Sequence, residues 1–163
     1  MMNSKRTVLL CLSGLDTRAF IEHTAPHVPR DRLLALLYVV DTRPAEELGY
    51  VARRLHAGPK ALAGREAMMS AADEQTAQAV LDEARAACAQ LGYSAQAIIP
   101  LVRRGRPEQQ IIEVAQLPEL NIGLVVIGSS YKRGPQGHTG PASVGHVARF
   151  VVDHSPCDVL LLR

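Results

Sequence analysis

The residues best suited to binding chemistry gather in one segment near the carboxyl terminus. Glycines occur at positions 128, 134, 137, 140 and 145, with Lys132 and Arg133 among them. Backbone N–H groups without intrachain partners in such a segment can contact the oxygens of an anion. The segment therefore predicts a site for an anion such as phosphate, although glycines that crowd a loop can also serve turns alone. The two cations either neutralise the charge of the anion or remain solvated.

Two further side chains are candidates for contact with a ligand. Ser13 directly follows the first apolar run of the chain, and we expect it to cap the next helix rather than to bind a ligand. His146 falls in the first turn of the last helical segment, where a protonated imidazole would contact an anion. We expect structural packing to be its main role.

The elements around the glycine-rich segment must place it at a sheet edge. Residues 124–127 are an apolar run, the segment after the glycine-rich loop is apolar at helical spacing, and residues 159–162 form a second apolar run. This order predicts a strand, a loop, a helix and a strand. Because such crossovers are right-handed, the loop lies at the carboxyl edge of the first strand and at the amino end of the helix. The positive end of the helix dipole favours an anion there.

Earlier parts of the chain predict three more strands. Thr7–Leu12 and residues 33–40 are nearly continuous apolar runs, which are typical of parallel strands buried on both faces. Residues 94–102 form the third of these predicted strands.

Helical segments lie between these strands. The first ends before Pro26 or Pro29, the second covers residues 44–92 with a break near Gly58 and Pro59, and the third follows Pro107. In the second segment, apolar residues keep the spacing of a helix that packs on a sheet. These residues are Ala77, Val80, Leu81, Ala84 and Cys88.

This alternation predicts one α/β domain over residues 1–163. Its architecture is an open, parallel, five-stranded sheet in the order 3-2-1-4-5, with helices on both faces. Ligands of such sheets bind where neighbouring strands lead to opposite faces, which here means strands 1 and 4. Both the Ser13 turn and the segment after Gly128 fall at that point.

Composition excludes several classes of function. With 163 residues, of which 47% are hydrophobic, the chain is long enough for one domain with a real core. A formal charge of +2, scattered basic residues and only four Tyr and two Phe argue against a nucleic-acid partner. Three cysteines without metal spacing predict neither a disulfide framework nor a metal site, and they fit a cytoplasmic protein. No apolar stretch approaches the ~18 residues of a membrane helix, so we expect no membrane partner.

Several short motifs resemble the universal stress protein family. Residues 145–151 resemble the Gly-Ser/Thr-Val pattern that opens the last helix of that family, and residues 154–161 resemble its Ala-Pro-Cys-Pro-Val-Leu run. Residues 38–41 resemble its His-Val-Val after the second strand, and residues 104–107 resemble its Gly-x-Pro turn. The resemblance covers the whole chain. It implies a flavodoxin-like, Rossmann-like protein that is usually a homodimer and is linked to stress survival.

Some members of this family bind ATP, so the resemblance implies positions for ATP or AMP in this chain. Mg²⁺ would enter only with the nucleotide. The implied nucleotide-binding residues are Leu12, Ser13, Val39, Ile127, Gly128, Ser130, Tyr131, Gly140, Ser143, Gly145, His146 and Val147.

The sequence departs from the ATP-binding pattern at three positions. Tyr131 replaces the second glycine of the family's Gly-x-x-Gly pair, and His146 replaces the Ser or Thr that follows its third glycine. Ser13 replaces an Asp at the end of the first strand. These departures predict a degraded nucleotide site.

Two alignments of the third glycine are open. If it is Gly145, the spacing from Gly128 exceeds the family pattern by about four residues, which is one helical turn and could lengthen the last helix. If it is Gly140, then Thr139 or Gly140 caps the helix, Pro141 begins it and Ser143 is free to meet a ligand.

These observations predict a stress-response protein without enzymatic activity and with a degraded ATP or AMP site. The alternative is a nucleotide-free, dimeric interaction protein of the same family, with residues 130–143 as a recognition element for a protein partner. A third reading follows from residues 13–17, which are similar to the loop of PP-loop ATP pyrophosphatases. They lack one glycine of that loop.

The last predicted strand also indicates a partner. In the order 3-2-1-4-5 it lies at the sheet edge, and its residues Val159, Leu160, Leu161 and Leu162 are apolar. Because an open apolar edge promotes association, we expect a homodimer joined through this strand.

Overall fold

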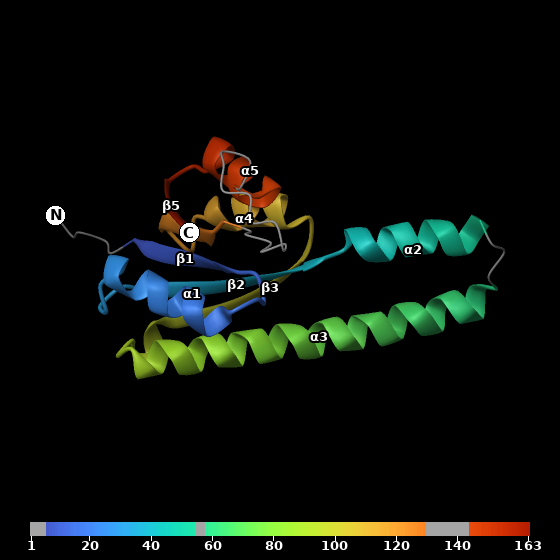
Figure 1. Cartoon of the computed structure of the whole chain (residues 1–163), viewed down its shortest axis with the longest axis horizontal. Coiled ribbons are helices and arrows are strands. Elements are labelled where there is room, and N and C mark those ends of the chain that lie inside the picture. Colours follow the sequence, from blue (N-terminus) through green and yellow to red (C-terminus); the bar gives the residue numbers. More distant parts are fainter. Residues whose placement is uncertain (1–5, 55–57, 130–143) are drawn as a thin grey trace, which may run out of the picture.

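A parallel five-stranded sheet forms the centre of the computed structural model, which describes residues 6–54, 58–129 and 144–163 (Figure 1). The strand order is β3-β2-β1-β4-β5, as predicted from the sequence. The strands are β1 (Thr7–Leu12), β2 (Leu34–Asp41), β3 (Ile98–Gly105), β4 (Ile122–Gly128) and β5 (Asp158–Leu162).

Helices cover both faces of the sheet. Helices α1 and α3 lie against one face, and α4 and α5 lie against the other (Figure 1). The α-helices are α1 (Thr17–Thr24), α2 (Arg43–Arg54), α3 (Pro59–Gln90), α4 (Pro107–Ala115) and α5 (His146–His154), with short 3-10 turns at Ala25–His27 and Ala95–Ala97. The predicted break near Gly58 and Pro59 is confirmed, since α3 begins at Pro59.

Two buried clusters hold these layers together. Successive residues of a strand point to opposite faces, so Leu10 packs with α1 and α3 while Leu9 packs with α4 and α5. The predicted apolar face of α3 is confirmed, because its members, which run from Ala77 to Cys88, are buried. Burial of apolar surface is the main force that stabilises such a core.

The third strand differs from the sequence prediction of residues 94–102. Residues 95–97 form a 3-10 turn, and β3 runs from Ile98 to Gly105. Its length is set by its neighbour, since β3 pairs in parallel with β2 from Ile98 opposite Leu34 to Gly105 opposite Asp41. β3 is an edge strand, and the side chains of Arg103 and Arg104 are exposed. These two charged residues can therefore belong to the strand without being buried.

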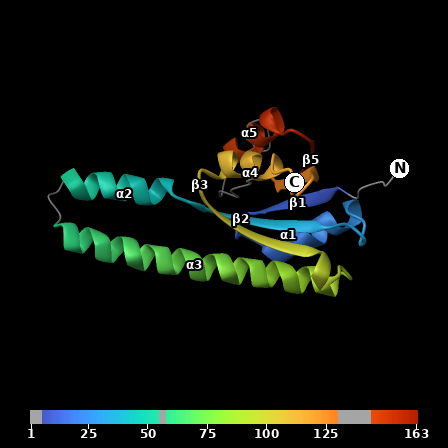
Figure 2. The same ribbon diagram turned by 180° about the vertical axis from the view of Figure 1, so that it is seen from behind.

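Two helices extend beyond the carboxyl edge of the sheet. Helix α2 and the first half of α3 project past the ends of the strands (Figures 1 and 2). At 1.5 Å per residue, α3 is roughly 48 Å long, and the residues that it buries lie in its second half. Arg104 links β3 to the middle of α3 through Asp73, with 3.6 Å between Nη1 and Oδ2. The carboxyl edge is therefore flanked by an arm formed by α2 and the first half of α3.

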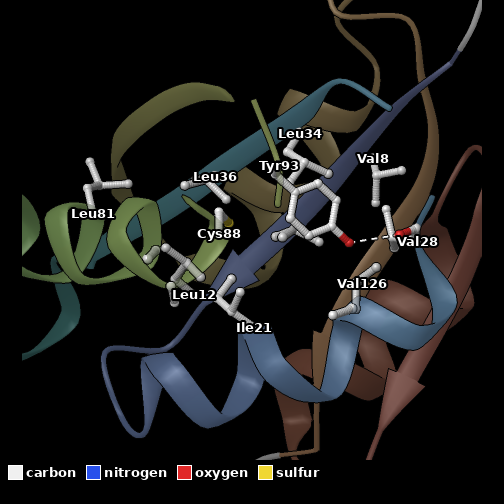
Figure 3. Close-up of a cluster of buried hydrophobic side chains, with 14 of the residues drawn as sticks. Val8, Leu12, Ile21, Val28, Leu34, Leu36, Leu81, Cys88, Tyr93 and Val126 are labelled. Carbon is white, nitrogen blue, oxygen red and sulfur yellow. Dashed lines mark hydrogen bonds between the residues drawn. The ribbon is translucent and has the colours of Figure 1, made fainter. Parts of the chain in front are cut away.

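Tyr93 is a buried residue that contacts the starts of β1 and β2 and the segment after α1. Its ring is buried with Val8, Leu34 and Cys88 (Figure 3). Its hydroxyl group donates a hydrogen bond to the carbonyl of Val28 at 2.7 Å, and it accepts one from Nη1 of Arg30, also at 2.7 Å. Burial raises the pKa of the Tyr93 phenol, so the group stays neutral.

Removing this hydroxyl group should destabilise the fold. We expect Tyr93→Phe to lower the free energy of unfolding by about 1–2 kcal/mol, because the buried carbonyl of Val28 loses its best donor. Urea denaturation followed by circular dichroism measures the change. Tyr50→Phe on α2 is the control, since that side chain is exposed and should give the wild-type value. Equal stability of the two variants would contradict this account.

Candidate functional site

The carboxyl ends of β1, β2 and β4 are neighbours at one edge of the sheet. In the parallel registers, Cys11 of β1 lies opposite Ile127 of β4, and Leu12 lies opposite Tyr38 of β2. From this edge β1 leads to α1 on one face, whereas the helix after β4 is α5 on the other face. Such a divergence is the place where open α/β sheets bind ligands.

The strand residues predicted for the site support the edge mainly by packing. Leu12 is buried with α1 and α3, Ile127 is buried with α4 and α5, and Val39 is half-buried against the same α4 and α5 cluster. Gly128 ends β4, and a Cβ atom there would lie 3.8 Å from Cδ2 of Phe20, an ordinary contact. Packing alone therefore does not require glycine at position 128.

Ser13 does not cap the first helix, in contrast to the sequence prediction. Helix α1 begins at Thr17, its N-cap is Asp16 with φ of 46°, and no side chain caps it. Oγ of Ser13 instead accepts a hydrogen bond from the N–H group of Leu15 at 3.3 Å. The prediction was wrong because the turn after β1 continues to Asp16. Ser13 therefore lies three residues before the N-cap position of α1. Ser13 is exposed at the edge, where it stabilises this turn.

The turn after β1 also depends on Gly14. Its φ of 78° lies in the left-handed region, which favours glycine. A Cβ atom at this position would lie 3.2 Å from Cε2 of Tyr38. Burial raises the pKa of Tyr38, and nearby Asp73 of α3 adds to the effect. Gly14 thus allows the β1 turn to pass close to the end of β2.

Helix α5 begins at His146, with Gly145 as its N-cap. The carbonyl of Gly145 accepts the hydrogen bond of the Arg149 N–H group at 3.0 Å, and Val144 is not helical. Two expectations are therefore wrong: the helix is not lengthened by a turn, and it does not run from Pro141. The extended backbone of Gly145, with ψ of 158°, ends the helix on its amino side. Ser130, Tyr131, Gly140 and Ser143, together with Lys132 and Arg133, lie outside the described residues.

His146 does not have the packing role expected for it. Its side chain is 72% exposed, and its Nε2 lies 3.7 Å from Oε1 of Glu108 on α4. At 3.6 residues per turn, His146 lies on the face of α5 opposite to Ala148 and Val151, which are buried. Val147 is half-buried against the α4 and α5 cluster. The imidazole of His146 is accordingly accessible to a ligand.

Glu108 is a site residue that the sequence prediction missed. It lies in the first turn of α4 after Pro107, yet it is only 5% exposed. Its Oε1 is 3.8 Å from Nη1 of Arg43 as well as 3.7 Å from His146. An acidic residue in a first turn usually indicates only a favourable interaction with the helix dipole. The sequence therefore offered a weak signal for this position.

The ion pair of Asp41 and Arg43 is shorter than the contacts that Glu108 makes with Arg43 and His146. Nη2 of Arg43 lies 2.6 Å from Oδ2 of Asp41, and Nε of Arg43 donates to Oδ1 at 2.9 Å. These hydrogen bonds hold the pKa of Asp41 below its ordinary value, so the carboxylate stays charged at neutral pH. Among the described residues, Asp41, Arg43, Glu108 and His146 thus meet at this edge, from the end of β2 and the starts of α2, α4 and α5.

The described ranges contain no group of three or more His, Cys, Asp and Glu residues placed to hold a metal ion. Within the same ranges, no helix has both the length and the apolar character needed to cross a membrane.

The fold defines a doubly wound α/β protein in which β1 and β4 lead to helices on opposite faces of the sheet. Sequence comparison gives the family: the profile of the universal stress protein family matches residues 21–163. The chain therefore belongs to the universal stress protein family. No curated protein sequence matches it.

Solved structures agree on the fold. Universal stress protein UspA from Lactobacillus plantarum is 24% identical, with a TM-score of 0.55 and 98% of each chain covered. A universal stress protein from Archaeoglobus fulgidus is 14% identical, with a TM-score of 0.61 over 97% of this chain and 98% of that one. A universal stress protein solved in complex with cAMP is 19% identical, with a TM-score of 0.58 over 97% and 96%.

The turn at Gly14 can be tested by a pair of glycine substitutions. Gly14 and Gly92 both have positive φ, but only Gly14 has atoms within 4 Å of the added Cβ position. We expect Gly92→Ala to lower the free energy of unfolding by about 1–2 kcal/mol through the left-handed backbone alone. Gly14→Ala should lower it further, because Tyr38 must move. Urea denaturation compares the two, and equal losses would show that the contact with Tyr38 is unimportant.

Proposed function

We propose that this protein is a stress-response protein that binds ATP or AMP at the carboxyl edge of β1 and β4. The observation that carries the proposal is the amino end of α5. Gly145 caps it without a side-chain hydrogen bond, and the first N–H groups of a helix have no intrahelical acceptor. These groups and the helix dipole favour a phosphate at this end.

Membership of the universal stress protein family supports a nucleotide as the ligand. One structural neighbour from that family was solved with cAMP. Mg²⁺ would arrive with the nucleotide, bound to its phosphates. His146 stands where the family pattern has a hydroxyl group, and its exposed imidazole can donate a hydrogen bond to a phosphate oxygen.

A binding role is favoured over catalysis. The hydroxyl group of Ser13 bonds to the backbone of Leu15, so it is not poised beside a general base. Residues 13–17 are also one glycine short of the PP-loop pattern, in which that glycine lets the backbone approach a pyrophosphate closely. A cytoplasmic location is part of the proposal, since the ligand is an intracellular nucleotide.

Calorimetry with ATP tests this function. We expect the purified protein to bind ATP with a Kd below about 100 µM, which corresponds to about 5.5 kcal/mol. Gly145→Val should weaken binding several-fold, because a branched side chain crowds the phosphate position at the start of α5. Gly58→Val is a matched control, since Gly58 is also a helix N-cap with extended ψ but lies at the start of α3. No binding by the wild-type protein would refute the nucleotide site.

The sheet edge formed by β5 favours a second function, a dimeric interaction protein. Among the described residues β5 pairs only with β4, and its residues Val159 to Leu162 are only half-buried. Open apolar edges are usually covered by another chain. We therefore propose a homodimer joined through β5. Residues 130–143 remain our proposed recognition element for a further protein partner.

Light scattering tests the dimer. Leu161→Lys should convert dimers into monomers, because a charge on β5 would be buried between the two subunits. Leu161 also packs on the α4 and α5 cluster, so circular dichroism must show that the monomer is folded. Met68→Lys on the exposed surface of α3 is the control and should remain dimeric. A folded Leu161→Lys protein that stays dimeric would place the interface elsewhere.

A further inference from the structure

Glu108 carries a buried oxygen atom that lacks a hydrogen bond. The residue is 5% exposed, and its Oε2 is buried with no hydrogen-bond partner among the described residues. Its Oε1 is 3.8 Å from Arg43 and 3.7 Å from His146, which is longer than a hydrogen bond. The carboxylate is thus surrounded by protein but is held only by longer-range attraction.

Such an arrangement is costly unless a donor completes it. Burial deprives a carboxylate of its favourable hydration free energy. Only hydrogen bonds and opposite charges within the protein compensate for that loss. The dipole of α4 helps, since Glu108 lies in its first turn. It does not supply a donor to Oε2. Oε2 is therefore a buried acceptor that can still accept a hydrogen bond from an N–H or O–H group.

The two neighbouring cations are poorly placed to provide that group. Arg43 donates from its backbone N–H, Nε and Nη2 to Asp41, and its Nη1 lies 3.8 Å from Oε1 of Glu108, which is too far for a hydrogen bond. His146 is mostly exposed at the start of α5, and its Nε2 is nearer to Oε1. Within the described ranges no other side chain donates to Oε2, so a ligand that enters from solvent is a fitting source of a donor.

The position of Glu108 determines which part of a bound ligand would contact this residue. Glu108 lies between Arg43, which follows the end of β2, and His146, which begins α5. Val39 of β2 packs on the same sheet face as α4. A ligand whose anionic group sits at the start of α5, and which extends toward the end of β2, passes Glu108.

A nucleotide has the required chemistry. Its phosphates suit the amino end of α5, and its nucleoside part carries N–H and O–H donors. We infer that Oε2 of Glu108 accepts a hydrogen bond from the nucleoside, and that Glu108 is therefore a specificity-determining residue of the site. This inference rests on the nucleotide function proposed above. The donor is the adenine amino group or the ribose 2′-hydroxyl group.

Two calorimetric comparisons test this inference. In the first, ATP is titrated into the wild-type protein, Glu108→Gln and Glu113→Gln. Glu113 lies on the same helix, is exposed and undergoes the same change of charge. We expect Glu108→Gln to weaken ATP binding about tenfold, because the charged acceptor becomes a neutral amide that accepts a weaker hydrogen bond. Glu113→Gln should bind like the wild type, and thermal denaturation should show that both variants are folded.

In the second comparison, the wild-type protein is titrated with ITP, which lacks the adenine amino group, and with 2′-deoxy-ATP. One of the two should bind more weakly than ATP, and that one identifies the donor. The difference should become smaller in Glu108→Gln, as expected when two groups interact directly. The donor itself is identified by the titrations of the wild-type protein, and this step does not depend on the folding of a variant.

The outcomes separate the inference from the function on which it rests. If the wild-type protein binds no nucleotide, both are overturned. If it binds ATP but Glu108→Gln binds equally well or more tightly, only the inference is overturned. The carboxylate then either has no effect on ATP affinity or repels the phosphates. Equal affinity of the wild type for ATP, ITP and 2′-deoxy-ATP would also overturn it.

Discussion

The burial of β1 and β4 between two helical layers is the constraint from which the rest of this structure follows. Leu9, Val125 and Val126 are completely buried at the centre of the sheet. A strand covered on both faces has no room for polar side chains. Chemistry is therefore confined to the ends of the strands. The carboxyl edge is the only end at which β1 and β4 lead to helices on opposite faces, because the sheet is parallel.

At this edge the charged groups come from separate elements. Asp41 ends β2, Arg43 begins α2, Glu108 lies in the first turn of α4 and His146 begins α5. Their mutual distances are set by how these elements pack on the sheet. The relatives of known structure share the fold at 14–24% identity, so the fold tolerates wide variation in sequence. Function on such a fold depends on the site and not on the fold, and in our proposal Glu108 and His146 are the edge residues that contact the ligand.

The proposed partner surfaces lie at different places on the molecule. β5 is one edge strand of the sheet, whereas the arm of α2 and α3 is linked to β3, the other edge strand, through Arg104. A dimer joined through β5 would leave the arm and the carboxyl edge accessible. Nucleotide binding and dimerisation are therefore compatible, and neither proposal excludes the other. The arm carries exposed apolar residues such as Leu48 and Met68.

The sequence by itself determined the strands, their order, the break before α3 and the family, because apolar runs, helical spacing and short motifs are local properties. It also predicted the carboxyl edge of β1 and β4 as the ligand site, which stays a prediction. Tertiary structure decided the extent of β3, which follows its pairing with β2, and the start of α5 at His146. It also decided that Ser13 forms a turn and that Glu108 is buried beside His146. These features depend on contacts between residues far apart in the chain, and burial of a charge has no local signature in sequence.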